Sequence, residues 1–218
     1  MSEPGLAPER SSAGLVRLVE AVATELLNHR DELNRLDGIA GDGDLGLTVS
    51  AACRALLELA PSLVDLPEAD AIRKAGTEIA RRAPSTGGTL AAFALLAAAK
   101  AGVSPDAALL ERAAGYLEAA SASIAQRGQV GLGDRTMLDA LAPATAAIRA
   151  ASARGDGVAT AQLDAARAAD AGASSTASMA AKVGRAGWLA DRAAGHEDAG
   201  ARLVALAFAA AAAHLEQP

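Results

Sequence analysis

Three aspartates, Asp37, Asp42 and Asp44, fall within eight residues of a short glycine-rich stretch between two segments with helical periodicity. Like charges this close repel one another, and glycine lowers stability unless the backbone needs a positive φ or a close approach. A bound cation would account for both features. Because the stretch offers only carboxylate oxygens, with no His or Cys nearby, it predicts a site for a hard cation such as Mg²⁺ or Ca²⁺ rather than zinc.

Two familiar glycine-rich motifs do not fit this stretch. The glycines of residues 41–46 match G-x-G-x-x-G, but a dinucleotide fingerprint needs a preceding apolar strand, and residues 31–35 are polar with a helical pattern. A calcium EF-hand starting at Asp42 needs a bidentate Glu at its twelfth position, which is Cys53 here. The alternative that stays open is a solvated acidic turn between two helices.

A second turn, residues 83–89, reads Ala-Pro-Ser-Thr-Gly-Gly-Thr and leads into an apolar helical pattern. The start of a helix presents N–H groups and the positive end of the helix dipole, and small residues let a phosphate come close. The turn is therefore a candidate partner for a metal-bound phosphate. Ordinary N-capping by Ser85, Thr86 or Thr89 explains the same composition equally well.

The composition favours a single all-α domain over residues 1–218. Of 218 residues 51% are apolar but 2% are aromatic, and alanine dominates, which suits closely approaching helices better than a strand-rich core. No Pro/Ser-rich linker divides the chain, and the polar residues 1–10 are expected to be flexible. Apolar periodicity predicts eight helices, the sixth capped by Asp134, over about residues 11–36, 47–60, 68–82, 90–101, 104–127, 134–154, 158–181 and 200–216.

Charge and cysteine content exclude several classes of function. The net charge is −6 and the basic residues are scattered, so neither nucleic acid nor an acidic membrane is an expected partner. Residues 1–10 lack an apolar signal region and no apolar run reaches transmembrane length, so a cytoplasmic protein is expected. The single cysteine, Cys53, lies in an apolar helical pattern and is interpreted as a small core residue.

Short connections between successive helices make neighbouring helices antiparallel, so alternate connections share one end of the bundle. The connections that follow odd-numbered helices carry the unusual chemistry, whereas those near Pro61, Ser104 and Gly155 do not. Alternation therefore brings acidic ligands, a phosphate-compatible helix start and Arg185 to one rim, which predicts a metal–nucleotide site. The four connections concerned are residues 37–46, 83–89, 128–134 and 184–200.

Four segments resemble, in order and spacing, the nucleotide-binding L subunit of dihydroxyacetone kinase or the equivalent C-terminal domain. Together they span nearly the whole chain. They are Leu36-Asp37 with Gly41-Asp42-Gly43-Asp44-x-Gly46, the Thr86-Gly87-Gly88 turn, Gly133-Asp134-Arg135-Thr136-Met137-Leu138-Asp139-Ala140-Leu141 with Pro143, and Gly184-Arg185-Ala186 followed by Leu189 and Gly195-His196-x-Asp198-x-Gly200-Ala201.

The resemblance implies an eight-helix antiparallel up-and-down barrel that holds ATP or ADP at one rim, with two Mg²⁺ ions bound by Asp37, Asp42 and Asp44. Arg185 is expected to act as the catalytic residue, because phosphoryl transfer depends on positioning and charge neutralisation. The positions expected to contact or lie near the nucleotide are Leu45, Gly46, Leu47, Thr48, Thr86, Gly87, Gly133, Met137, Arg185, Asp198 and Gly200.

The resemblance also implies a partner, because in this family the ketose is held covalently on a histidine of a separate K subunit. A homodimer or a hetero-oligomer is therefore expected. Leu45 replaces the histidine typical of versions served by a phosphocarrier protein, and residues 47–49 and 84–88 also depart from the usual sequences. These departures favour freely exchanging ATP as the donor over a phosphocarrier acting on bound ADP.

Three functions stay open: a kinase subunit for dihydroxyacetone or another short ketose, a regulatory module that holds structural ADP, and, less favoured, the ATP domain of a fatty-acid kinase. Neither His29 nor His214 is placed like a nucleophile. His29 is expected to be solvated, His214 to serve a surface or packing role, and His196 to be a loop residue or a substrate contact. Trp188 is expected to fill the rim rather than stack on a base.

Overall fold

The computed structural model describes residues 11–182 and 190–215, so the predictions for residues 1–10, Arg185 and Trp188 lie outside it. Two short 3₁₀ turns, η1 (Ala60–Ser62) and η2 (Thr176–Ser178), follow α3 and α8. The α-helices are α1 (Ala13–Asn28), α2 (Arg30–Ala40), α3 (Leu45–Leu59), α4 (Glu68–Arg82), α5 (Thr86–Ala98), α6 (Leu109–Gly128), α7 (Leu138–Arg154), α8 (Val158–Ser175), α10 (Ala190–Ala193) and α11 (Ala199–Leu215).

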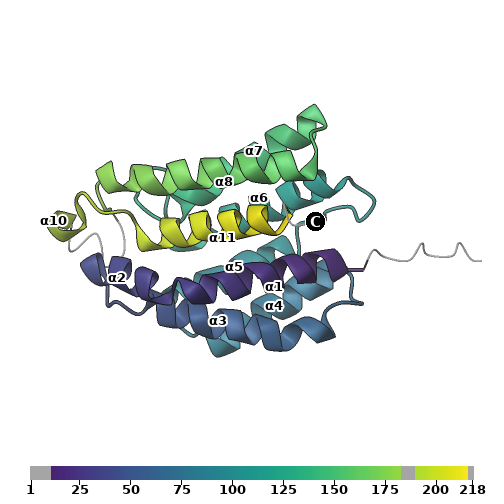
Figure 1. Ribbon diagram of the computed structural model, residues 1–218, viewed down its shortest axis with the longest axis horizontal. Helices are drawn as coiled ribbons and strands as arrows, with labels where there is room; N and C mark the ends of the chain where they lie inside the picture. Colours follow the sequence, from purple (N-terminus) through teal and green to yellow (C-terminus); the bar gives the residue numbers. More distant parts are fainter. Residues whose placement is uncertain (1–10, 183–189, 216–218) are drawn as a thin grey trace, which may run out of the picture.

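Eight of these helices form a closed ring. Following the chain, α1 packs on α3, α3 on α4, α4 on α5, α5 on α6, α6 on α7, α7 on α8, and α8 on α11, which returns to α1 (Figure 1). The described residues contain no strand, and one isolated bridge joins Ser11 to Pro67. The all-α fold class predicted from the sequence is confirmed. No helix in the described part of the chain is long and apolar enough to cross a membrane.

Alanine allows the close packing on one side of the ring. On α8, Ala161, Ala165, Ala169 and Ala173 recur every four residues and each is 0% exposed, which places one face of α8 against α7 and α11. A Cβ built on Gly172 would lie 2.2 Å from the carbonyl oxygen of Asp139 on α7, so the two backbones almost touch. The prediction that the alanine-rich composition brings helices close together is confirmed.

The first predicted helix is in fact two helices. α1 ends at Asn28, His29 has a non-helical backbone, and α2 starts at Arg30. The first turn of α3 presses on this break, because a Cβ on Gly46 would lie 1.9 Å from the carbonyl oxygen of Arg30. The periodicity of the apolar residues continues through the break, which is why the sequence pattern did not show it.

Three helix starts also differ from the sequence prediction by four or five residues. α6 begins at Leu109, five residues after the predicted start. α5 begins at Thr86, four residues before the predicted start, because Ser85 caps it. α7 begins at Leu138, so Asp134 is not its N-cap. Asp134 instead accepts a hydrogen bond from the Gly131 N–H at 2.7 Å and pairs with Lys182 at 2.8 Å.

Hydrogen bonds and contacts place the connections at two opposite ends of the barrel. At one end the Ser12 Oγ donates to the Leu63 carbonyl (2.5 Å), and Arg112 at the start of α6 pairs with Glu68 at the start of α4. At the other end lie the acidic turn, α10 and the start of α11 (Figure 1). The contacts described below link the chemically unusual connections at that second end, called here the acidic end.

Candidate functional site

The three aspartates of the acidic turn converge. Asp37 lies in the last turn of α2, Asp42 in the connection, and Asp44 immediately before α3. One carboxylate oxygen from each lies within 4.8 Å of the others. The Asp37 Oδ2 accepts hydrogen bonds from the Gly43 N–H at 2.8 Å and the Asp44 N–H at 3.0 Å, which folds the turn back onto α2.

The donor set fits Mg²⁺. Magnesium takes oxygen ligands in an octahedron with metal–oxygen distances of about 2.0–2.1 Å, so ligands on opposite sides of the ion are about 4 Å apart. The three carboxylate oxygens already lie within 4.8 Å of one another, so small rotations of the side chains would bring them to these distances around one ion. Gly41 leaves the necessary room, because a Cβ there would lie 2.4 Å from the Asp37 Oδ1. Asp37, Asp42 and Asp44 are thus the residues that would hold the ion.

The glycine turn before α5 lies beside the acidic turn. The Ser85 Oγ accepts a hydrogen bond from the Gly88 N–H at 3.0 Å, so the ordinary N-cap is present. Thr86 and Gly87 are the first two residues of α5, where N–H groups have no acceptor within the helix. A Cβ on Gly87 would meet the Cδ1 of Leu45 at 3.9 Å, which brings the two turns together.

The first turn of α3 contains both residues that pack into the core and residues that face solvent. Gly46 is buried against the backbone of α2, and Leu45 packs against the core cluster of α1, α2 and α3. Leu47 is 56% exposed and Thr48 is half-buried. Leu47 is therefore the most accessible of the four residues predicted to contact nucleotide here.

The connection between α6 and α7 is shaped by Asp139. This buried carboxylate accepts hydrogen bonds from the Gly133 N–H at 2.6 Å and the Thr136 N–H at 2.8 Å. Gly133 needs its glycine because its φ is +84°. Met137 reaches the start of α11, where a Cβ on Gly200 would lie 3.4 Å from the Met137 Cβ. The predicted site residues Gly133, Met137 and Gly200 are thus adjacent elements of one rim.

Asp198 caps α11. Its Oδ2 accepts a hydrogen bond from the Ala201 N–H at 2.8 Å, and its own N–H donates to the Thr176 Oγ1 at 2.8 Å. Burial raises the pKa of the Asp198 carboxyl above its ordinary value, although the Ala201 N–H and the charge of Arg135 act in the opposite direction. The structure therefore gives this predicted nucleotide-binding residue a capping role.

Asp198→Ala is expected to lower the free energy of unfolding by about 1 kcal/mol through loss of the cap, whereas Asp198→Asn keeps an acceptor oxygen and removes the buried charge. Because the folded-state pKa is raised, the charge costs stability above the unfolded pKa of about 3.9, and that cost vanishes at lower pH. At pH 7 the Asp198→Asn protein therefore avoids this cost, and the difference in free energy of unfolding between it and the wild type is expected to shrink below about pH 4. Urea unfolding at pH 7 and pH 3.5 measures it; equal losses in both variants would contradict the capping role.

Hydrogen bonds join the acidic turn to the α10–α11 region. The Arg192 Nη2 donates to the Gly38 carbonyl at 3.3 Å, and the Arg135 Nη2 donates to the carbonyls of Ala193 and His196 at 3.1 and 3.0 Å. Sequence reasoning assigned no role to Arg135 or Arg192. The buried position of Arg135 has no periodicity signal, because the residue lies between helices.

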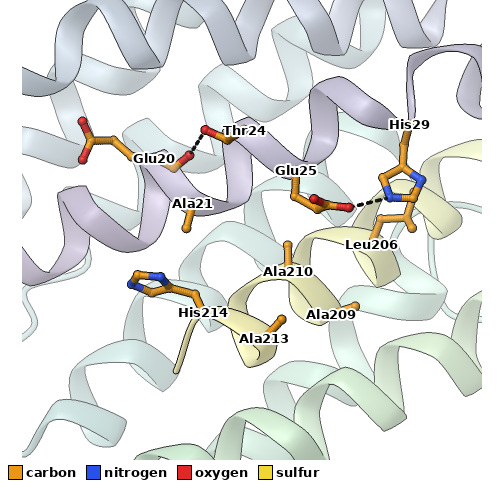
Figure 2. Close-up of a pocket in the computed structure, with 10 residues that line it drawn as sticks. All are labelled: Glu20, Ala21, Thr24, Glu25, His29, Leu206, Ala209, Ala210, Ala213 and His214. Carbon is orange, nitrogen blue, oxygen red and sulfur yellow. Dashed lines mark hydrogen bonds and ion pairs between the residues drawn. The ribbon is translucent and has the colours of Figure 1, made fainter. Parts of the chain in front are cut away.

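The groove shown in Figure 2 lies between α1 and α11 and has a volume of about 550 Å³. Its floor is formed largely by alanines, and its rim includes Glu25, His29 and His214. None of the residues predicted to bind metal or nucleotide lines it. His29 is hydrogen-bonded to Glu25 at 3.3 Å and Glu32 at 2.8 Å, so it is more constrained than the solvated residue expected. The groove is separate from the acidic-turn site.

Cys53 is buried among α1, α2 and α3, as predicted. Burial raises the pKa of its thiol to about 11, which keeps it protonated and unreactive near neutral pH.

The chain belongs to the DAK2 domain family, whose model matches residues 39–213. It is 36% identical over 203 residues to the D-erythrulose kinase of Mycolicibacterium smegmatis, covering 90% of this chain and 34% of that protein. It is also 28% identical over 172 residues to the ADP-binding subunit DhaL of the PEP-dependent dihydroxyacetone kinase of Escherichia coli, covering 79% of this chain and 82% of that subunit.

A solved structure shares the fold. The dihydroxyacetone kinase from C. freundii in complex with AMP-PNP and Mg²⁺ superposes with a TM-score of 0.72 at 28% identity, covering 98% of this chain and 37% of the other. The resemblance to the L subunit and its equivalent domain is therefore confirmed at the level of family and fold. The chain spans about a third of the length of several kinases that it matches, between 33% and 37%.

Proposed function

We propose that this chain is the nucleotide-binding, phosphoryl-donating part of a kinase for dihydroxyacetone or a related short ketose. The convergence of three aspartate carboxylates at the acidic end, beside the start of α5, carries the proposal. The names of the relatives support the reaction class, since they include a D-erythrulose kinase and a dihydroxyacetone kinase subunit. A structural relative bound to AMP-PNP and Mg²⁺ supports both the nucleotide and the metal.

The residues divide the work of binding the nucleotide. Asp37, Asp42 and Asp44 would hold Mg²⁺, and two ions are proposed. When bound, Mg²⁺ would neutralise negative charge on the phosphate oxygens. The N–H groups of Thr86 and Gly87 lie at the positive end of the α5 helix dipole, where they would donate hydrogen bonds to a phosphate of the nucleotide.

The remaining rim residues complete the proposed site. Leu47, which is exposed, and Thr48 are proposed to contact the nucleotide beside the metal, and Gly133, Met137 and Gly200 are proposed to line another part of its site. Arg185 is proposed as the catalytic cation that balances the charge of the transferred phosphoryl group.

The acceptor ketose comes from a partner in this proposal. The match to the DhaL subunit supports a separate ketose-binding K subunit, and ATP is proposed as the donor because Leu45 replaces the histidine typical of phosphocarrier-dependent versions. A phosphocarrier acting on bound ADP is the alternative donor. A homodimer or a complex with the K subunit is the proposed assembly.

ATP consumption with and without a candidate K subunit tests this function. Turnover is expected only in the mixture and only with a short ketose, such as dihydroxyacetone or erythrulose. Hydrolysis-free nucleotide binding under every pairing would contradict the kinase role and support a regulatory module with structural ADP. Phosphoenolpyruvate-dependent turnover with a phosphocarrier, in the absence of ATP, would overturn the proposed donor.

A further inference from the structure

Arg135 occupies an unusual place in the rim. It is 4% exposed, and its φ of 63° lies in the left-handed region that non-glycine residues rarely adopt. Burying a guanidinium and holding a strained backbone both cost free energy, so the surrounding contacts must offset them. A residue with no role beyond linking α6 to α7 would not require either feature.

The contacts of Arg135 reach across the rim rather than along its own connection. Its Nη2 donates to two backbone carbonyls, of Ala193 and His196, which lie 58 and 61 residues further along the chain. The described part of the chain supplies no hydrogen-bond partner for its buried Nε. The guanidinium is thus held mainly by the end of α10 and by the loop between α10 and α11.

The loop held in this way also touches the other parts of the proposed site. Arg192, one residue before Ala193, donates to the Gly38 carbonyl of the acidic turn at 3.3 Å. At its far end the loop continues into Asp198 and Gly200, and Gly200 lies against Met137. The charge of Arg135 also acts on the Asp198 carboxyl.

The neighbouring residue adds a second tie from the same connection. Asp134 pairs with Lys182 at 2.8 Å, and this ammonium lowers the pKa of the Asp134 carboxyl. Asp134 is therefore tied to Lys182, before α10, and Arg135 to the last residue of α10 and to His196 after it.

We propose that Arg135 is a positioning residue that fixes residues 193–200, the loop from the end of α10 to the start of α11, against Met137 and the acidic turn, and so sets the affinity of the rim for Mg-nucleotide. This inference rests on the proposed function, because the nucleotide site is itself a proposal. Arg135 acts here through the loop backbone and needs no contact with the nucleotide.

The chain offers a matched control for a test. Arg112 is also 4% exposed, and it donates to the Ala107 carbonyl at 2.7 Å and to both carboxylate oxygens of Glu68 at 2.9 Å. It lies at the end of the barrel opposite the acidic turn. Arg→Lys at either position keeps the charge but removes the ability to reach two acceptors with one planar group.

Calorimetric titration with Mg-ADP, together with thermal unfolding of the ligand-free proteins, compares Arg135→Lys with Arg112→Lys. Both substitutions are expected to lower the melting temperature, but only Arg135→Lys is expected to weaken Mg-ADP binding, by about tenfold or more. Wild-type affinity in Arg135→Lys, or an equal loss in Arg112→Lys, overturns the inference and leaves the proposed function intact. A wild-type chain that binds no Mg-ADP overturns both.

Hydrogen exchange on the wild-type chain decides the matter if Arg135→Lys does not fold. Mg-ADP is expected to slow amide exchange in residues 193–201 as well as in the acidic turn, because the loop and the turn are linked. Slowing confined to the acidic turn and the start of α5 would overturn the inference.

Discussion

Asp44→Ala is expected to abolish Mg-dependent nucleotide binding while leaving the helix content intact. Removing one of three converging carboxylates leaves too few ligands for Mg²⁺, and even residues that only support metal ligands typically cost about 10- to 100-fold in affinity. Asp42→Ala is expected to behave in the same way. Isothermal calorimetry with Mg-ADP measures the affinity, and circular dichroism checks the fold.

Asp106→Ala is the matched control for these variants. Asp106 is exposed in the connection before α6, at the end of the barrel opposite the acidic turn. It is expected to keep wild-type affinity. Unchanged affinity in both Asp42→Ala and Asp44→Ala would remove the metal assignment and return the acidic turn to a solvated loop.

Gly46→Ala is expected to be among the most damaging single-methyl changes. The added Cβ would lie 1.9 Å from the Arg30 carbonyl oxygen and 2.7 Å from the Asn34 Oδ1, and the first of these is backbone that cannot rotate away. α3 must then move from the α1–α2 break, at a cost of about 3 kcal/mol or more. Because α3 starts directly after Asp44, the acidic turn moves with it.

The free energy of unfolding of Gly46→Ala, measured with urea, is compared with that of Gly14→Ala. Gly14 is also near the start of a helix, but a Cβ there meets nothing within 4 Å. This substitution is expected to raise the free energy of unfolding by about 0.5–1 kcal/mol, since alanine favours the helix over glycine. A Gly46→Ala protein as stable as Gly14→Ala would show that α3 does not pack on α2 as described.

Much of the fold followed from periodicity and turn chemistry. α4 was predicted from apolar periodicity with its observed bounds, Glu68–Arg82; in the structure Pro67 precedes it and basic residues occupy its last turn. The break at His29 was missed, because it depends on α3 pressing against Arg30, a contact between segments that apolar periodicity does not encode. Asp134 was predicted as a cap from its type alone, whereas the buried Asp139 organises that connection.

The site was predictable to a similar degree. The type and spacing of Asp37, Asp42 and Asp44 pointed to a hard cation, and alternation of helix direction placed the other turns at the same end. The contact between Leu45 and Gly87 is consistent with that placement. Arg135 could not be identified as a positioning residue from the sequence, because its acceptors are backbone carbonyls about 60 residues away. Every residue has a backbone carbonyl, so these acceptors cannot be recognised from the residue types.

Anomalous diffraction from a crystal grown with ADP and Mn²⁺ tests the central claim most directly, because Mn²⁺ shares the preference of Mg²⁺ for oxygen ligands. The structure predicts a manganese peak about 2.0–2.2 Å from carboxylate oxygens of Asp37, Asp42 and Asp44, with the ADP phosphates between that peak and the start of α5. A peak elsewhere, or three carboxylates that point away from the bound nucleotide, would contradict it.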